Sequence, residues 1–501
     1  MENNKLKKFS FLLSCLIILP YLIFRLINQA KIINYFPLDI TNDISSHLAQ
    51  LYFLKSCGFH NLCTYWYNGF YLLKFYPPGW FFFTYPLLLI FKKVETAAFV
   101  SILLMLVVSF IAIYKIINLN KKSWLNSLTF FLLLFGTATS ISGFFRLGRV
   151  TELFGWMIFL ILAYFILKYK EKEIKINFLW FSVFYAVLLV AQPIVAIPFH
   201  FFLFGLFLIK LNKKKELFFL GISILIGLFL SSFWWYPFIT DIENESRTYE
   251  YLPEIRERFF DLSGQWTSSV ILITFLPIIT LIMFYIYYYS NDKNKKELLF
   301  YSPVLLLAFL VLTRIATFIP YLNFVYPEPY FTFFIIFILI FLFQTNIEKL
   351  PIFMQKSLHI SLMLVVIIST LASFFITSYY IDHTELEKDT LEILNSVNER
   401  FIILESPSST SYPKAYYSYG AIYLNLSTVS GWSPSEMTDE YKNNLNSLAK
   451  EFKEEKCGNF LDLAKKISLK QVVTYNEYCS LKEKCGLKKI KTMGNVCLLK
   501  I

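Results

Sequence analysis

The sequence predicts an all-α polytopic membrane protein with a small α/β domain at its C-terminus. Hydrophobic residues make up 56% of the 501 residues and charged residues only 16%, whereas soluble proteins average about 25% charged. Apolar runs of about twenty residues, the length that crosses a bilayer, recur from Phe9 to Tyr379. The rest of the chain is more polar and has no such run. We therefore expect a membrane domain at 1–380 and a second domain at 381–501.

The apolar runs predict about eleven transmembrane helices. These lie near 9–29, 97–117, 124–144, 152–168, 176–190, 194–210, 217–238, 268–289, 299–318, 330–346 and 357–379. The first run follows lysines, as in a signal peptide, but no small-residue cleavage site comes after it, so we expect a retained helix. Two alternatives stay open: one kinked segment around Gln192 and Pro193, and a short extra span at 79–91.

The lysines indicate how the chain is oriented. The net charge is +12, and its lysines cluster between apolar runs, where short cytoplasmic loops are expected. With the N-terminus inside and an odd number of spans, the C-terminal domain lies outside the cell membrane. The first outer loop is then 30–96. Because the basic charge follows the membrane topology, it argues against a nucleic-acid partner.

The cysteines fit an oxidising compartment on that outer side. Six of the seven lie in segments predicted to be outside, which favours disulfides; Cys479 and Cys485 are close in sequence, but the pairing stays open. The tail lacks the C-x2-4-C spacing of structural zinc sites. Its periodicity predicts helices at 386–398, 435–454 and 460–466 and strands at 401–404, 421–426, 467–474 and 496–501.

The first outer loop contains the candidate catalytic residues Asp39, Asp43 and His47. If a helix starts at Ile44, Asp43 and His47 lie on one face at spacing i, i+4. A carboxylate at a membrane interface is costly to bury and is often functional. The alternative is that Asp43 caps this helix, and both roles are compatible.

Aromatic residues near the same predicted membrane face are candidates for contact with a sugar or an acceptor. They are Trp66, Tyr67 and Tyr76 in the first outer loop and Trp235 at the end of a later span. Stacked aromatic rings with polar tips suit sugar rings. They equally suit the aromatic belt at the lipid headgroups, and their number alone does not distinguish the two.

A short outer connection carries Arg146, Arg149 and Glu152. The guanidinium group is well shaped for forked contacts with phosphate. These residues are therefore candidates for binding a donor phosphate. The alternative is an Arg149–Glu152 pair that only holds the hairpin together.

These features in this order resemble the type-C (GT-C) membrane glycosyltransferase superfamily. Within it, the chain is most similar to the prokaryotic branch called the 6-pyruvoyl-tetrahydropterin synthase-related membrane domain. The likeness is carried by five segments: Asp43–His47, Gly58 with Trp66, Asn68–Pro78, Gly148–Glu152 and Phe233–Pro237. It covers about residues 9–380. One departure is the segment 326–330, which has no arginine where relatives often carry one.

The resemblance implies transfer of a sugar from a polyprenyl-phosphate donor to an acceptor, which is a glycan, a protein or a lipid, on the outer face of the plasma membrane. A carboxylate takes the proton of the acceptor hydroxyl, and positive charge from arginine or a divalent cation, Mg or Mn, stabilises the leaving phosphate. Asp43 and Glu152 are the candidate metal ligands. The alternatives are a transporter or flippase for a lipid-linked substrate and a non-catalytic envelope scaffold.

Overall fold

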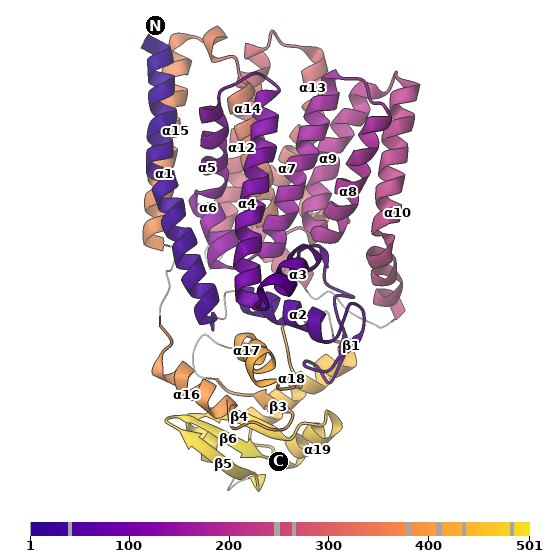
Figure 1. Cartoon of the computed structure of the whole chain (residues 1–501), viewed down its shortest axis with the longest axis vertical. Helices are drawn as coiled ribbons and strands as arrows, with labels where there is room; N and C mark the ends of the chain where they lie inside the picture. Colours follow the sequence, from indigo (N-terminus) through magenta and orange to yellow (C-terminus); the bar gives the residue numbers. More distant parts are fainter. Residues whose placement is uncertain are drawn as a thin grey trace.

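The protein is a bundle of long helices with a mixed region of short helices and strands at one end (Figure 1). The computed structural model describes residues 2–38, 43–244, 251–262, 267–376, 382–406, 413–432, 437–480 and 485–501. The start of α1 lies at one end of the bundle, and the C-terminus lies beyond the other end (Figure 1). This arrangement agrees with a chain whose two ends lie on opposite sides of a membrane.

The bundle helices follow the predicted apolar runs. They are α1 (Glu2–Tyr35), α4 (Val94–Asn118), α5 (Trp124–Phe135), α7 (Val150–Glu171), α8 (Trp180–Ala191), α9 (Pro193–Lys210), α10 (Lys214–Asn244), α12 (Thr267–Ser290), α13 (Lys295–Leu312), α14 (Pro327–Gln344) and α15 (Ile352–Ile376). In the described part of the chain, eight helices are long and apolar enough to cross a membrane, or nine if one bent pair is a single span. The predicted number of eleven therefore stays a prediction.

Three expected spans account for the difference in number. The expected span 124–144 bends by 50° between α5 and the following α6 (Ala138–Ser140) and η1 (Ile141–Arg146). The run of η2 (Ile176–Leu179) and α8 is short, and α13 begins with the charged residues Lys295, Lys296 and Glu297. Gln192 separates α8 from α9, so the single kinked segment is not what forms.

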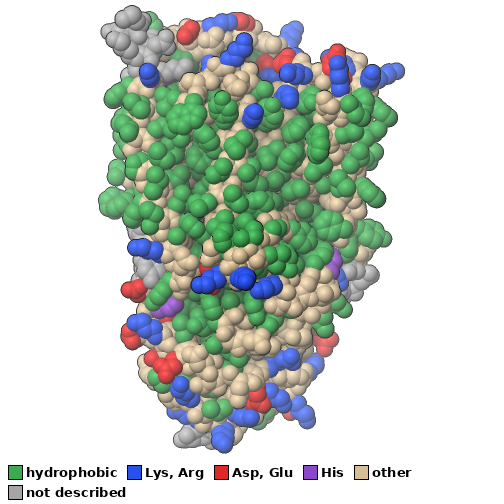
Figure 2. All heavy atoms as spheres, viewed as in Figure 1, with side chains coloured by type: hydrophobic (Ala, Val, Ile, Leu, Met, Phe, Trp, Pro, Cys, Tyr) green, Lys and Arg blue, Asp and Glu red, His purple; other side chains and the backbone are tan. Residues whose placement is uncertain are grey.

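The lysine clusters gather at the end of the bundle where α1 begins. Their ion pairs join different helix ends, including Lys170 with Glu297 at 2.8 Å and Lys210 with Glu216 at 2.6 Å. Figure 2 shows a broad band of hydrophobic side chains with lysines and arginines above it and others below it. The ion pairs place the lysine clusters of four connections close together at one end of the bundle. The positive-inside rule makes this end the cytoplasmic one, which remains our expectation.

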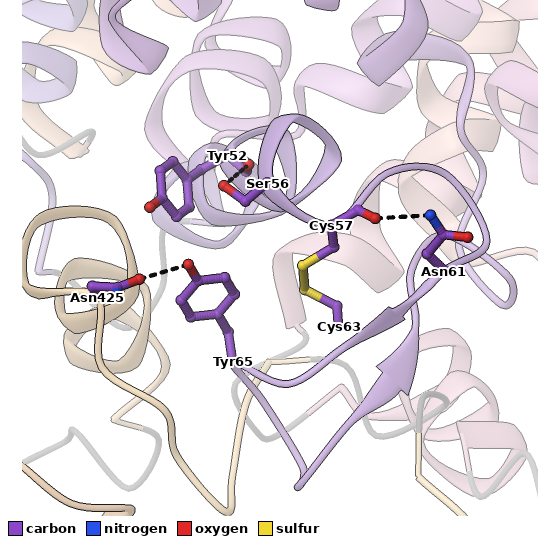
Figure 3. Close-up of a disulfide and its surroundings, with 7 residues drawn as sticks. All are labelled: Tyr52, Ser56, Cys57, Asn61, Cys63, Tyr65 and Asn425. Atoms are coloured by element: carbon purple, nitrogen blue, oxygen red, sulfur yellow. Dashed lines mark hydrogen bonds between the residues drawn. A yellow bond between two sulfur atoms is a disulfide. The ribbon is translucent and has the colours of Figure 1, made fainter.

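The opposite end holds the first loop, folded between the bundle and the C-terminal region (Figure 1). It contains α2 (Ile44–Ser56), the antiparallel strands β1 (Leu62–Cys63) and β2 (Phe70–Tyr71), and α3 (Gly79–Phe91). A Cys57–Cys63 disulfide closes it, and the Tyr65 hydroxyl donates to the Asn425 side chain at 2.7 Å (Figure 3). The Thr428 backbone N–H donates to the carbonyl O of Tyr65 at 2.9 Å. These bonds fasten the C-terminal region to the first loop.

The C-terminal region is built on a four-stranded sheet in the order β3-β4-β6-β5. The strands are β3 (Phe401–Ile403), β4 (Gln471–Tyr475), β5 (Lys488–Met493) and β6 (Val496–Lys500), and all pairs are antiparallel except β3 with β4. The helices are α16 (Glu385–Leu394), α17 (Lys414–Leu424), α18 (Asp439–Lys453) and α19 (Cys457–Lys466). The described remainder of the chain adds α11 (Tyr251–Phe260) and the 3-10 turns η3 (Ile315–Phe318), η4 (Leu322–Phe324), η5 (Ile347–Lys349) and η7 (Asn476–Ser480).

One sequence-based expectation for this region was wrong, and the pairing of the cysteines, which the sequence left open, is now given. The strand predicted at 421–426 is wrong, because these residues continue α17, which ends where Asn425 adopts a positive φ of 55°. The disulfides are Cys457–Cys485 and Cys479–Cys497. The sequence neighbours Cys479 and Cys485 are therefore not paired with each other, since the fold brings each close to a more distant partner.

Candidate functional site

Asp43 lies where the first loop meets the connection before α7. Its backbone N–H donates to the carbonyl O of Leu147 at 2.9 Å. Asp43 occupies the N-cap position of α2, but its side chain makes no capping hydrogen bond. Its Oδ1 instead accepts a bond from Lys414 Nζ at 2.6 Å. The carboxylate is therefore engaged with a cation of the C-terminal region, and the capping alternative does not describe its side chain.

Arg149 and Glu152 lie next to this loop and meet two further charged residues. Arg149, the N-cap residue of α7, is 3.8 Å from Glu152 and 3.5 Å from Glu328 Oε1. Arg258 of α11 lies 3.5 Å from the same Glu328 oxygen. Two guanidinium groups from separate elements thus converge on one carboxylate at the first turn of α14. The Arg149–Glu152 pair expected as the alternative is present, but it belongs to this larger cluster.

The electrostatics link Asp43 to the arginine. Burial alone would lower the pKa of Arg149, but the carboxylates of Glu328, Glu152 and Asp43 raise it above its ordinary value. Arg149 therefore stays charged despite its burial. Glu152 is almost fully buried and accepts a hydrogen bond from the Trp156 indole at 3.0 Å. The structure thus brings Asp43, Arg149 and Glu152 into one cluster.

His47 is enclosed by aromatic rings on the next turn of α2. Its ring lies 4.9 Å from that of Trp432, 5.8 Å from that of Trp80 and 5.9 Å from that of Tyr76, between centroids. Burial lowers the pKa of His47 to about 4, so the imidazole is neutral at physiological pH. A neutral imidazole has one nitrogen that accepts a hydrogen bond and one that donates, and Nδ1 has no partner within the described structure.

The face of α2 that carries Asp43 and His47 has further unused hydrogen-bonding atoms. Helical spacing places Ser46 and Gln50 on this face. Both side chains are buried, with 0% and 1% of their surface exposed. The Ser46 hydroxyl and both polar atoms of the Gln50 amide have no hydrogen-bond partner within the described structure. Each buried polar atom left unpaired costs about 1–3 kcal/mol. The face therefore offers donors and acceptors that a polar ligand or water would satisfy.

The other residues expected at the site lie in different settings. Tyr76 is close by, with its hydroxyl 3.2 Å from that of Thr151. Trp66 is fully buried against Phe53 and Phe70, so its indole offers no open surface. Tyr67 is also buried and packs against Gly431.

The remaining expected residues are Trp235, Arg146 and Asp39. The Trp235 indole donates to the carbonyl O of Leu228 in its own helix. Arg146 ends η1, one turn before Arg149. Asp39 lies outside the described residues.

The donor atoms of the cluster do not fit a divalent cation. Asp43 and Glu152 are the expected metal ligands, but Asp43 accepts a hydrogen bond from Lys414 and Glu152 faces Arg149 and Trp156. Among the described residues, no group of three or more His, Cys, Asp and Glu side chains could hold a metal ion. The positive charge in this cluster comes from side chains.

Sequence reasoning missed Lys414, Trp432, Arg258 and Glu328. Lys414 and Trp432 come from the C-terminal region, and Lys414 is 371 positions from Asp43, so no local spacing joins them. For segment 326–330, the sequence showed no arginine where relatives carry one; the structure supplies Arg258 there from α11. Its guanidinium also lies 4.9 Å from the centre of the Tyr326 ring. One sequence feature could have pointed to this site: Glu328 is a charged residue between two prolines at the start of a predicted span.

No protein-family model and no curated protein sequence matches this chain. Solved structures do. Archaeal oligosaccharyltransferase AglB from Archaeoglobus fulgidus, in complex with an inhibitory peptide and a dolichol-phosphate, aligns with a TM-score of 0.52 and 10% identity, over 93% of this chain and 70% of that one. The apo form of the Archaeoglobus fulgidus oligosaccharyltransferase gives 0.53 and 12%, with the same coverage. Its complex with Zn and sulfate gives 0.48 and 12%, over 92% and 68%.

Because the sequence identity is only 10–12%, these similarities show the fold and nothing further. The chain shares the fold of these oligosaccharyltransferase structures, with a helical bundle and a C-terminal region that follows it. This agrees with the expected fold class. The narrower branch expected from the sequence order is not distinguished by these comparisons.

Proposed function

We propose that this protein is a membrane glycosyltransferase that moves a sugar from a polyprenyl-phosphate donor to an acceptor at the outer face of the plasma membrane. One observation carries the proposal: in a GT-C type fold, a carboxylate, Asp43, and two arginines, Arg149 and Arg258, belong to one cluster at the end of the bundle opposite the lysine clusters. The order of motifs along the chain further supports the 6-pyruvoyl-tetrahydropterin synthase-related branch.

The reaction needs a base for the acceptor hydroxyl. As the acceptor oxygen bonds to the anomeric carbon, its proton passes to the Asp43 carboxylate. The bond from that carbon to the phosphate oxygen breaks, and its electron pair leaves with the lipid phosphate. Lys414 occupies Oδ1 of Asp43, which leaves the other oxygen for the acceptor. A positioned general base of this kind contributes about 10²–10⁴ in rate.

The two arginines suit the leaving phosphate. Arg149 and Arg258 both point to Glu328 Oε1 at 3.5 Å, longer than the 2.7–2.9 Å that charged hydrogen bonds of this kind usually reach. Glu328 Oε2 is buried and has no hydrogen-bond partner within the described structure. Arg149, at 3.5 Å from Glu328 and 3.8 Å from Glu152, is paired loosely enough for its guanidinium group to donate to a tetrahedral anion. A phosphate between the two arginines would be held in a forked contact, which would stabilise the charge that develops on departure.

The α2 face suits the hydroxyl groups of a sugar. Ser46, His47 and Gln50 offer unpaired donors and acceptors one or two turns from Asp43. Tyr76 and Trp432 add aromatic surface beside His47. Sugars are bound by this combination of hydrogen bonds and ring faces. Dolichol-phosphate in the AglB complex is a lipid of the class we propose as donor carrier. In this protein, the donor would reach the site from among the membrane lipids.

The test is transfer by purified protein carrying Asp43→Asn. Asparagine keeps the shape and still accepts a bond from Lys414 but cannot take a proton, so turnover should fall at least about a hundredfold with the thermal midpoint preserved. Wild-type protein mixed with lipid-linked sugars and candidate acceptors should release polyprenyl phosphate. Movement of the intact lipid-linked sugar across vesicles without release would instead identify a flippase. Near-normal transfer by folded Asp43→Asn protein would remove Asp43 from the chemistry.

A further inference from the structure

Lys414 enters the cluster from the C-terminal region in a fixed position. It is the first residue of α17, and its side chain is 9% exposed. The helix packs along α2 and is held to the sheet by the Tyr417 hydroxyl, which lies 3.1 Å from the backbone N of Ile403. The ammonium group lies 2.6 Å from Asp43 Oδ1. The Lys414 side chain is buried and fixed by its helix, so its ammonium group is a permanent part of the site, although Asp43 is 30% exposed.

Among the described residues, three carboxylates of the cluster are matched by three cations. Asp43, Glu152 and Glu328 are the carboxylates, and Lys414, Arg149 and Arg258 are the cations. His47, with a pKa lowered to about 4 by burial, adds no charge at neutral pH. A divalent ion bound at Asp43 would lie within a few ångströms of the Lys414 ammonium. Two such charges about 4 Å apart repel by several kcal/mol in a partly buried site.

We propose that Lys414 is the resident cation of this site, in the place where a metal-dependent enzyme would hold a divalent ion beside its carboxylate, and that transfer needs no metal. The inference rests on the proposed function. Lys414 orients the Asp43 carboxylate toward the acceptor, and the phosphate charge is met by Arg149 and Arg258. The C-terminal region thus completes the site, so the bundle alone does not form an active enzyme.

The first test compares metal dependence in two readouts. Full-length wild-type protein treated with excess EDTA should keep its turnover within about twofold of that in Mg²⁺ or Mn²⁺. Electron paramagnetic resonance should show no stoichiometric Mn²⁺ bound to it. Loss of transfer in EDTA with recovery on Mn²⁺ would overturn the inference. One tightly bound Mn²⁺ that disappears in Asp43→Asn would overturn it as well. The Mn²⁺ binding measurement does not depend on transfer activity. If no transfer is found under any condition, the proposed function is rejected, and the binding measurement still tests the inference.

The second test separates the site role of Lys414 from a structural one. Lys414→Met keeps the length and apolar stem but removes the charge, and turnover should fall at least about thirtyfold. Lys414→Arg should recover most of it. The matched control is Lys388→Met, since Lys388 pairs with Glu385 on the surface of the same region; its turnover should not change. If Lys414→Met lowers the thermal midpoint while folded protein keeps full turnover, Lys414 only joins the two parts of the chain, and the inference fails.

Discussion

The two ends of the bundle both contain buried ion pairs, but the pairs differ in how well they are made. At the lysine end, Glu297 accepts two bonds from Lys170, at 2.8 and 3.0 Å, and one from Tyr287 at 2.7 Å. At the other end, Glu328 shares one oxygen between two arginines at 3.5 Å, and its second oxygen has no partner within the described structure. Both oxygens of Glu297 therefore have hydrogen-bond partners, whereas one oxygen of Glu328 has none in the described structure. We call these two ends of the bundle the lysine end and the open end.

This difference separates a scaffold from a candidate site. Buried charges contribute to a fold only when their hydrogen bonds are satisfied, as those of Glu297 and Glu216 are, the latter by Lys210, Lys213 and a backbone N–H. Unsatisfied polar atoms at the other end cost stability and are expected where a ligand completes them. We therefore expect substitutions at the lysine end to change stability and those at the open end to change turnover.

The largest effect should come from exchanging one cation at each end. Arg149→Gln removes a phosphate contact, so turnover should fall about a hundredfold or more. The free energy of unfolding should fall by less than at the lysine end, because Glu152 and Glu328 lie 3.8 and 3.5 Å from Arg149 and are paired with it only loosely. Lys170→Met leaves Glu297 buried without its cation and should cost about 3 kcal/mol of stability, with turnover per folded molecule unchanged. Detergent-solubilised protein would be assayed for transfer and for denaturant unfolding. The reverse pattern would remove the distinction between the ends.

The sequence predicts contacts between residues that are close in sequence better than contacts between residues that are far apart in sequence. The apolar runs located the bundle helices, and charge alternation located the lysine end, because both are local patterns. Asp43 and Arg149 were both expected in outer segments, on the same side of the membrane. Lys414 and Arg258 were missed because their contacts cross 371 and 70 positions of sequence, respectively. Trp66 shows the opposite error, since an aromatic residue in a loop looks the same whether it faces a ligand or fills a core.

A smaller effect should distinguish two buried glutamines. Gln50 on the α2 face has an unpaired amide, so Gln50→Met should leave stability unchanged or slightly higher but reduce transfer about tenfold, because a sugar contact is lost. The control is Gln355→Met. Gln355 donates to the carbonyl O of Leu350 at 2.7 Å, and its loss should cost about 1–3 kcal/mol without changing turnover. Equal stability losses in the two variants would mean that the Gln50 amide is paired in solution.

The smallest effect we expect is an acid sensitivity confined to the open end. The folded protein holds the pKa of His47 at about 4 by burial, against an ordinary value of 6.5. At a pH between these two pKa values, the unfolded chain binds a proton that the folded protein does not. The stability is therefore fully present above the unfolded-state pKa of 6.5 and falls as the pH drops toward the folded-state pKa of about 4. From about pH 7 to about pH 5.5 the loss should be about 1 kcal/mol.

Substituting the histidine is the way to assign that loss. His47→Phe fills the aromatic enclosure without a titratable group, so its unfolding free energy should lose less than that of the wild type over the same pH interval. His383→Gln is the comparison variant: His383 donates to the carbonyl O of Phe36 at the edge of the C-terminal region, and the loss assigned to His47 should persist in this variant. If His47→Phe and wild-type protein lose stability in parallel, the imidazole is already solvated in the folded state. The α2 face would then be open to water before any substrate arrives, and the difference between the two ends would reduce to their ion pairs.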